Sequence, residues 1–119
     1  MKRRILVLAV ASALAALALS ALGQAATPKL VGTSGPGFSI EVTKGGKDVK
    51  TLKHGTYTIV VHDKSSAHNF HLFGPGVSKK TSVSAVTTKT WKVTLKKGKY
   101  TYQCDVHAAS GMKGSFRVT

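Results

Sequence analysis

Cysteine and acidic side chains are both scarce in this chain of 119 residues. Cys104 is the single cysteine, so an internal disulfide framework, which often staples small exported domains, is excluded. Only four acidic residues oppose 18 lysines and arginines, and they are Glu41, Asp48, Asp63 and Asp105. The resulting formal net charge of +14 favours an acidic protein or an anionic surface as a partner.

Several kinds of sequence pattern are also missing. The lysines are spread along the whole chain and no nucleic-acid recognition motif accompanies them, so we expect no nucleic-acid partner. Scattered lysines that only keep strand faces in solution are the alternative to a steering role. After residue 25 we find no helical period, no internal repeat and no interdomain linker, which argues against a helical or multidomain protein.

The first 25 residues have the composition of a secretory signal peptide. Three basic residues, Lys2 to Arg4, precede an apolar stretch over residues 5–22, and Ala25 ends a small-x-small cleavage site. A retained membrane anchor is the alternative, because the stretch is near the shortest length that spans a bilayer. A lipid anchor is excluded, since no cysteine lies at the cleavage point.

Cleavage after Ala25 predicts an exported protein, periplasmic or extracellular. Residues 26–119 are then enough for one small domain. Its formal charge would fall from +14 to +11, because three of the 18 basic residues leave with the signal and no acidic residue does.

From residue 29 onward, short alternating segments separated by glycine, proline, aspartate and lysine turns predict β-strands. About seven or eight such strands in one domain predict an all-β, antiparallel β-sandwich. The two-residue period assigns five sets of side chains to the inward faces of strands. These sets are Phe38, Ile40 and Val42; Tyr57, Ile59 and Val61; Trp91, Val93 and Leu95; Tyr100, Tyr102 and Cys104; and Phe116 and Val118.

Four side chains able to bind a metal lie in two short segments. Cys104, His107 and Met112 fall within nine residues at the end of a strand. His68 lies at an upstream strand boundary, after a strand that we expect beside the Cys104 strand. Thiolate and thioether favour Cu(I), and imidazole serves both copper oxidation states, so these ligand types suit a trigonal copper site with a weak axial thioether. A bound metal would also account for an unpaired thiol in an oxidising compartment.

The segment GKYTYQCDVH, which ends at His107, and the segment MKGSF, which begins at Met112, resemble the C-terminal signature of the cupredoxins. The spacing of two residues between Cys104 and His107, and of four between His107 and Met112, is similar to that of plastocyanin and pseudoazurin. His68 and Asn69 resemble the upstream ligand segment of the same families.

This resemblance implies a cupredoxin-like Greek-key sandwich, a small blue (type 1) copper protein with one Cu(I)/Cu(II) ion. It implies His68, Cys104, His107 and Met112 as the copper ligands. It also implies that Asn69 supports the ligands from outside by tying the two loops together with hydrogen bonds. Two residues between the ligands, Asp105 and Val106, depart from the family pattern.

The function implied by the resemblance is the transfer of single electrons between redox partners, without enzyme activity. We expect a monomer whose partner is an acidic redox protein, such as a cytochrome or a copper oxidase, or else an anionic membrane surface. The alternative function is a periplasmic copper carrier or chaperone, with His71 as an accessory ligand that assists metal capture.

Other interpretations of the same residues are weaker. Zinc is poorly served by the thioether of Met112. A nucleophilic Cys104 activated by His107 lacks a third orienting group and an oxyanion motif. His68 and His71 would point to opposite faces of an extended strand, so we expect only one of them to reach a single copper. We favour His68 as that ligand because Asn69 follows it. We expect His54 and His62 to be solvated.

Overall fold

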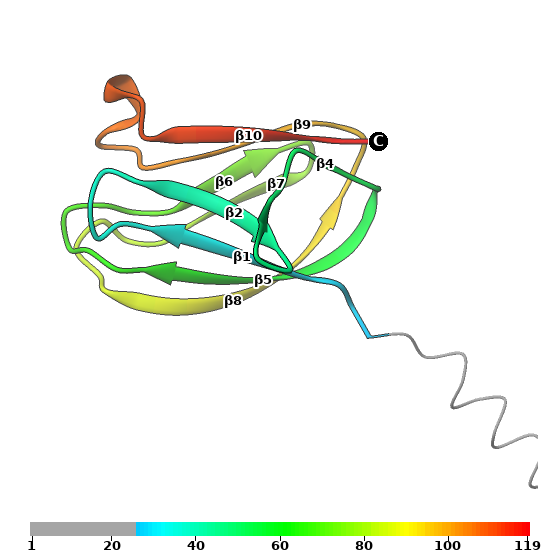
Figure 1. Cartoon of the computed structure of the whole chain (residues 1–119), viewed down its shortest axis with the longest axis horizontal. Helices are drawn as coiled ribbons and strands as arrows, with labels where there is room; N and C mark the ends of the chain where they lie inside the picture. The colour runs from blue at the N-terminus through cyan, green and yellow to red at the C-terminus, as the bar shows by residue number, and fades with distance from the viewer. Residues whose placement is uncertain (1–25) are drawn as a thin grey trace, which may run out of the picture.

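Two β-sheets face each other in residues 26–119, which are the part of the chain that this computed structural model describes (Figure 1). The first sheet has the strand order β3-β2-β1-β5-β8, and the second has the order β4-β10-β9-β6-β7. The predicted signal peptide, residues 1–25, lies outside the described residues. Within residues 26–119, no helix has the length and apolar character needed to cross a membrane.

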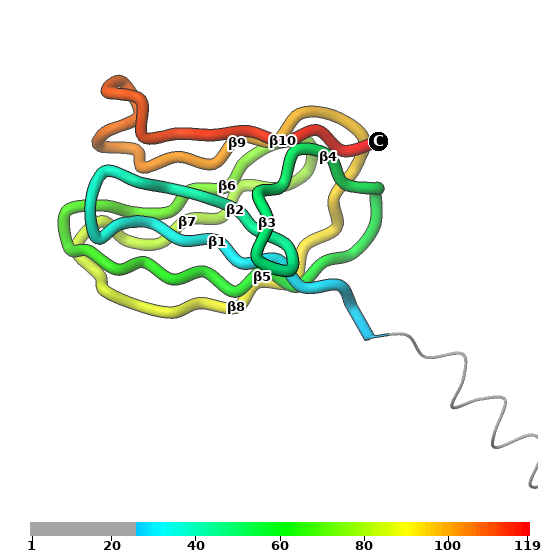
Figure 2. The backbone as a smooth tube through the Cα atoms, in the orientation of Figure 1, coloured from blue at the N-terminus to red at the C-terminus, as the bar shows by residue number. Residues whose placement is uncertain are grey.

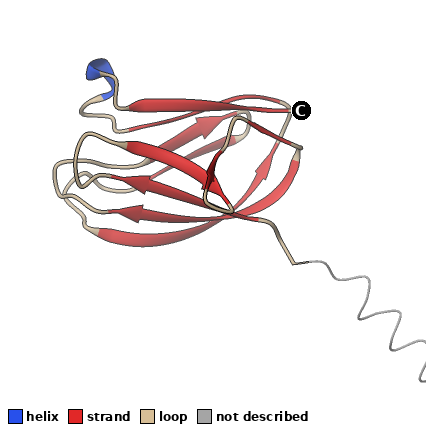
Figure 3. Cartoon of the chain, in the orientation of Figure 1, coloured by secondary structure: helices blue, strands red, loops and turns tan. Residues whose placement is uncertain are grey.

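Strands dominate the secondary structure of the described residues, which contain one 3-10 turn near the C-terminus (Figure 3). The elements in chain order are β1 (Lys29–Ser34), β2 (Ile40–Lys44), β3 (Lys47–Asp48), β4 (Thr51–Leu52), β5 (Gly55–Asp63), β6 (His71–Gly74), β7 (Val77–Lys80), β8 (Thr87–Leu95), β9 (Gly98–Gln103), η1 (Ala108–Ser110) and β10 (Lys113–Val118).

The predicted all-β sandwich is confirmed, with more strands than the seven or eight expected and with mixed sheets in place of antiparallel ones. The described residues contain ten strands, and two of these, β3 and β4, are only two residues long. A segment of two residues is too short for alternation to reveal. One pair in each sheet is parallel, namely β1 with β5 and β10 with β4. Parallel pairing depends on connections that cross between sheets, which a two-residue period within one strand does not report.

The core fills the space between the sheets and confirms four of the five predicted inward-facing sets. Their members are less than a tenth exposed, except that Trp91 is partly buried and packs against the core. Stacked aromatic rings tie the second sheet together, with Tyr100 and Phe116 at a centroid distance of 5.5 Å. Each buried ring or branched side chain of this kind contributes about 1.5–3 kcal/mol through removal from water.

The prediction that Phe38 faces the core is wrong, since Phe38 is 73% exposed. β2 begins only at Ile40, and Phe38 lies in the loop that follows Gly35-Pro36-Gly37. Gly35 adopts a positive φ of 76°, a conformation that favours glycine, so the chain turns here and the strand starts later than alternation suggests.

The strand ends define two poles of the molecule (Figures 1 and 2). The loop pole holds the loops over residues 35–39, 64–70, 81–86 and 104–112. The distal pole holds the start of β1, the turn between β2 and β3, the segment around β4, the turn between β8 and β9, and the C-terminus. All metal-ligand candidates predicted from the sequence lie at or next to the loop pole.

Candidate metal centre

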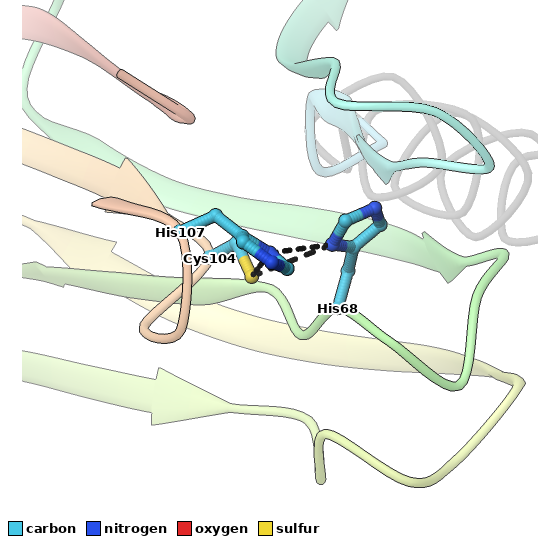
Figure 4. A group of neighbouring side chains, drawn as sticks. All are labelled: His68, Cys104 and His107. Carbon is cyan, nitrogen blue, oxygen red and sulfur yellow. Dashed lines mark hydrogen bonds between the residues drawn. The ribbon is translucent and has the colours of Figure 1, made fainter. Parts of the chain in front are cut away.

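Three ligand-type side chains from two loops converge at the loop pole (Figure 4). Nδ1 of His68 lies 2.9 Å from Nδ1 of His107. Sγ of Cys104 lies 3.8 Å from Nδ1 of His68 and 3.5 Å from Nδ1 of His107. Across residues 26–119, this is the one group of three His, Cys, Asp or Glu side chains whose ligand atoms all lie within 4.8 Å of one another.

The triangle formed by these three atoms has the size of a metal site. The point equidistant from the two nitrogens and the sulfur lies about 2 Å from each, near the bond lengths of about 2.0–2.3 Å that such ligands make to divalent metals of zinc size. Two imidazoles and one thiol are also the ligand types that copper accepts in both oxidation states. The site is therefore compatible with one copper ion.

Cys104 reaches the site because it continues the alternation of β9 beyond Gln103. Like Tyr100 and Tyr102 it faces inward, and it is 0% exposed. The chain then folds back on itself, since the Cys104 N–H donates to the Met112 carbonyl at 3.1 Å. Gly111 makes this return possible with a φ of 94°, which is in the left-handed region that favours glycine.

Further backbone hydrogen bonds hold His107 and Met112 beside Cys104. The His107 N–H donates to the Cys104 carbonyl at 3.1 Å, and the Met112 N–H donates to the His107 carbonyl at 3.2 Å. Met112 is 3% exposed. The loop over residues 104–112 thus keeps all three of its predicted ligands in one compact turn.

His68 lies in the loop over residues 64–70, which crosses from the first sheet to the second. The expectation that the strand before His68 lies beside the Cys104 strand is wrong, because β5 belongs to the other sheet. β6, which follows the loop, pairs with β9 and sets His71 opposite Gln103. Alternation within a segment does not report which sheet that segment joins.

Phe70 anchors this crossing loop to the core. Its ring is fully buried and stacks on Tyr102 at a centroid distance of 6.2 Å. It also lies directly against Gly32, where an added Cβ would come within 2.6 Å of the ring. The Phe70 N–H donates to Oγ1 of Thr81 at 2.8 Å, which fixes the backbone two residues after His68.

Asn69 joins the two loops that carry the cluster. Its Oδ1 accepts the Asp105 N–H at 2.8 Å, and its Nδ2 donates to Oδ2 of Asp105 at 3.0 Å and to the Thr81 carbonyl at 3.3 Å. Asn69 is 2% exposed, and its own carbonyl accepts the Ser34 hydroxyl at 2.9 Å. We call the two bonds between Asn69 and Asp105 the asparagine clasp.

Asp105 is the centre of a polar network beside Cys104. Besides the clasp, its carboxylate accepts Nε2 of Gln103 at 3.0 Å and Nδ1 of His71 at 2.9 Å. Partial burial raises the pKa of Asp105, but the hydrogen bonds from Gln103, Asn69 and His71, with the charge of His71, outweigh it and lower the pKa to about 2. The sequence marked Asp105 as unusual, but two of its partners, Asn69 and His71, come from another segment and could not be assigned.

His71 lies outside the cluster. Its Nδ1 contacts Asp105, and its Nε2 lies 3.1 Å from the Ser78 hydroxyl. The structure therefore places both ring nitrogens against protein partners. The other two histidines also lie apart from the cluster, with His54 bonded to the Thr119 carbonyl at 2.9 Å and His62 to the Thr88 hydroxyl at 3.3 Å.

Phe38 covers the cluster from the loop over residues 35–39, a placement that alternation did not predict. Its ring meets the His68 and His107 rings edge to face, at centroid distances of 5.2 and 4.9 Å. Gly35, at the start of this loop, lies close to the His68 ring, because an added Cβ there would lie 3.3 Å from Cδ2 of His68. A sequence signal was present, since an apolar ring after Gly-Pro-Gly is poorly placed to begin a buried strand.

Exposure differs sharply among the four predicted ligands. His68, Cys104 and Met112 are each at most 3% exposed, whereas His107 is only partly buried. Val106, next to His107, is 57% exposed. The cluster is therefore enclosed by protein except on the His107 side.

Solved structures share the two-sheet sandwich on which the two imidazoles and the thiol converge. The copper protein rusticyanin aligns with a TM-score of 0.60 and 23% identity, over 81% of this chain and 80% of that chain. Reduced rusticyanin gives a TM-score of 0.58 and 25% identity, with 81% of each chain covered. Reduced auracyanin from the photosynthetic bacterium Roseiflexus castenholzii gives 0.53 and 20%, over 82% of this chain and 99% of that one.

These likenesses identify the fold of the chain as that of the cupredoxins. No family model and no curated protein sequence matches the chain. A subtype similar to plastocyanin or pseudoazurin stays a prediction, since the structural neighbours described above are rusticyanin and auracyanin.

Proposed function

We propose that this chain is an exported protein that binds one copper ion through His68, Cys104, His107 and Met112 and transfers single electrons between redox partners. The observation that carries the proposal is the convergence of two imidazoles and one buried thiol at atom separations that fit one metal ion. A bound copper ion would supply a one-electron Cu(I)/Cu(II) couple. Rusticyanin, which has the same fold, is a copper protein.

The protein's own contribution is to hold the ligands still. Cys104 and His107 are fixed by the backbone hydrogen bonds of their loop, and His68 is fixed by the anchored residue Phe70 and by the asparagine clasp. Ligand side chains that are held in place this way change their positions little between the two oxidation states of a bound metal. Small positional changes suit electron transfer. The clasp therefore supports the role outside the ligand shell that we propose for Asn69.

His107 is the proposed point at which electrons enter and leave. It is the one predicted ligand with partial exposure, and the exposed side chains of Phe38 and Val106 lie next to it. We propose that a redox protein, such as a cytochrome or a copper oxidase, docks a monomer of this chain over these side chains. That the partner is acidic stays a prediction.

The enclosure of the site favours electron transfer over copper delivery. A carrier needs ligands that a partner can reach, but three of the four predicted ligands are at most 3% exposed. His71, the proposed helper of a carrier, is bonded to Asp105 and Ser78 instead. The buried thiol of Cys104 also disfavours an enzyme that uses this sulfur as a nucleophile, because a substrate could not reach it.

The visible spectrum after addition of Cu(II) tests the copper site. Residues 26–119, the part of the chain that the structure describes, contain ten strands and a core packed between the two sheets, so this segment, with folding verified by circular dichroism, is the protein to use. We expect an intense thiolate-to-copper band that disappears in Cys104→Ser and persists in the control His62→Asn, whose histidine lies apart from the cluster. A folded wild-type protein without this band contradicts the proposal.

Two rates then separate the electron carrier from the copper carrier. An electron carrier should show fast electron self-exchange and slow loss of copper to a chelator, and a copper carrier should show the reverse. Export is tested separately, by N-terminal sequencing of the protein recovered from outside the cytoplasm, where a start at Ala26 is expected.

A further inference from the structure

The basic residues are unevenly distributed between the two poles of the molecule. Nine of the 15 lysines and arginines that follow residue 25 lie towards the distal pole, and all nine are exposed. They are Lys29, Lys44, Lys47, Lys50, Lys53, Lys96, Lys97, Lys99 and Arg117. In the described part of the chain, Asp48 is the one acidic side chain that lies among them.

We call these nine residues the basic pole. Their distribution does not match steering of an acidic partner towards His107, because the basic pole is at the other end of the strands (Figure 1). The residues nearest to His107 include the apolar Phe38 and Val106 and the carboxylate of Asp105. A negatively charged partner would therefore be attracted to the basic pole, which lies at the end of the molecule opposite the metal cluster.

A cavity in the basic pole brings three cations together. Lys50, Lys99 and Arg117 line it with Ser115 and Phe116, and its volume is about 320 Å³. The pairing of β9 with β10 sets Lys99 directly opposite Arg117, and the Arg117 N–H donates to the Lys50 carbonyl at 3.0 Å. Like charges directly opposite each other in a sheet destabilise it.

No carboxylate relieves this repulsion. Among residues 26–119, His71 and Asp105 form the single ion pair closer than 4.0 Å, and it lies at the other end of the strands. Ser115, which can donate a hydroxyl hydrogen bond, lines the same hollow. A hollow lined by an arginine, two lysines and a serine suits a phosphate group.

The course of the chain indicates where that phosphate comes from. β1 begins at Lys29 at the distal pole, so whatever precedes residue 26 joins the sandwich on this side. The preceding sequence carries the basic residues Lys2 to Arg4 and the apolar stretch over residues 5–22. Before cleavage after Ala25, a leader inserted in a bilayer would present the basic pole to the lipid headgroups, and the basic pole remains on the domain after cleavage.

We propose that the basic pole docks on the surface of an anionic phospholipid bilayer, with a lipid phosphate in the cavity of Lys50, Lys99 and Arg117, and that the metal cluster then faces away from the membrane. This surface does not depend on copper, so the inference stands or falls separately from the proposed function. Docking would confine the protein to a plane while leaving His107 free to meet a partner.

Vesicle co-sedimentation tests the docking. Residues 26–119 without the leader should bind vesicles of phosphatidylcholine mixed with phosphatidylglycerol, and not vesicles of phosphatidylcholine alone. Replacement of Lys96, Lys97 and Lys99 by glutamine should weaken binding about a hundredfold, because each basic residue near an anionic leaflet contributes about fivefold. Added salt should release the protein.

The matched control replaces three lysines away from the basic pole with glutamine, namely Lys64, Lys80 and Lys89. This variant has the same net charge as the first and should keep most of the vesicle affinity. Equal losses in the two variants would overturn the proposal, since they would mean that net charge alone drives binding. Circular dichroism shows whether each variant is folded.

Two further experiments test the orientation of the protein on the vesicle and the chemical class of the ligand that the basic pole binds. Nitroxide-labelled lipids should broaden the amide resonances of residues 96–99 and spare those of residues 104–112, and the reverse pattern would overturn the proposal. Binding to heparin or to an acidic protein through the same three lysines, without binding to the anionic vesicles, would assign the basic pole to a soluble polyanion and would also overturn it.

Discussion

Replacement of Asn69 by alanine tests the asparagine clasp most directly. The change removes the acceptor of the Asp105 N–H at 2.8 Å and the donors to the Asp105 carboxylate at 3.0 Å and to the Thr81 carbonyl at 3.3 Å. A bond to a charged group contributes about 1.5–3 kcal/mol and a neutral bond about 1 kcal/mol. Because water can reach part of Asp105, we expect a loss of about 3 kcal/mol in the free energy of unfolding.

Urea denaturation of the metal-free protein measures this loss. With a slope of about 1.5–2 kcal/mol per molar urea for a small domain, the midpoint should fall by about 2 M. The matched control is Gln103→Ala, which removes one 3.0 Å bond to the same carboxylate but joins no separate loops, since the partners are two residues apart. We expect the control to cost less than about 1 kcal/mol, because this bond is exposed.

The copper-loaded protein gives a second readout for Asn69→Ala. Loss of a residue that orients metal ligands typically lowers metal affinity about 10–100-fold, and we expect a decrease in this range. If Asn69→Ala and Gln103→Ala lower the unfolding free energy by the same amount, within about 0.5 kcal/mol, the clasp does not hold the loops together and our reasoning fails.

Two more predictions concern the side chains beside the cluster. The pKa of Asp105 is about 2 in the folded protein against a usual 3.8. The ionised carboxylate therefore adds to the free energy of unfolding above about pH 4, and this contribution is lost as the pH falls through 2. Solvent around this carboxyl, whose side chain is 32% exposed, limits the effect to about 1 kcal/mol, and Asp105→Asn should abolish it in acid urea titrations of the metal-free protein. Phe38→Ala should lower the unfolding free energy of the metal-free protein by only about 1 kcal/mol, the contribution of its edge contacts with the imidazoles, because the ring is otherwise mostly in solvent. It should also make copper loss to a chelator about fivefold faster, because about 1 kcal/mol of edge contact with the imidazoles disappears, and an unchanged rate would contradict this role of the ring.

The sequence predicted what depends on period and spacing. Alternation along β9 gave the inward direction of Tyr100, Tyr102 and Cys104, and the short separation of Cys104 from His107 limited how far apart their side chains could lie. His68 was selected as the upstream ligand because Asn69 follows it, and the structure brings this histidine, and not His71, to the cysteine.

What the sequence did not predict depends on contacts between distant segments. The parallel partner of β1, the sheet that receives β6 and the partners of Asp105 are set by how the strands assemble, and no local period carries that information. Phe38 shows that alternation can fail within one segment, since the Gly-Pro-Gly turn before it keeps Phe38 in a loop although it fits the alternating pattern of the following strand. The two-residue strands β3 and β4 exist only because longer neighbours pair with them.

The hydrogen bonds around Asn69 belong to a longer polar chain that spans three loops. The carboxylate of buried Asp63 accepts a hydrogen bond from the Thr81 hydroxyl at 2.7 Å. The Thr81 carbonyl in turn accepts one from Nδ2 of Asn69, and the asparagine clasp joins Asn69 to Asp105. Loops linked in series cannot open one at a time without breaking a shared bond, so they should behave as a single cooperative unit in hydrogen exchange. Since these links are made by protein atoms alone, the loops that carry His68 and Cys104 are held together without a metal, and loading a metal need not be coupled to folding.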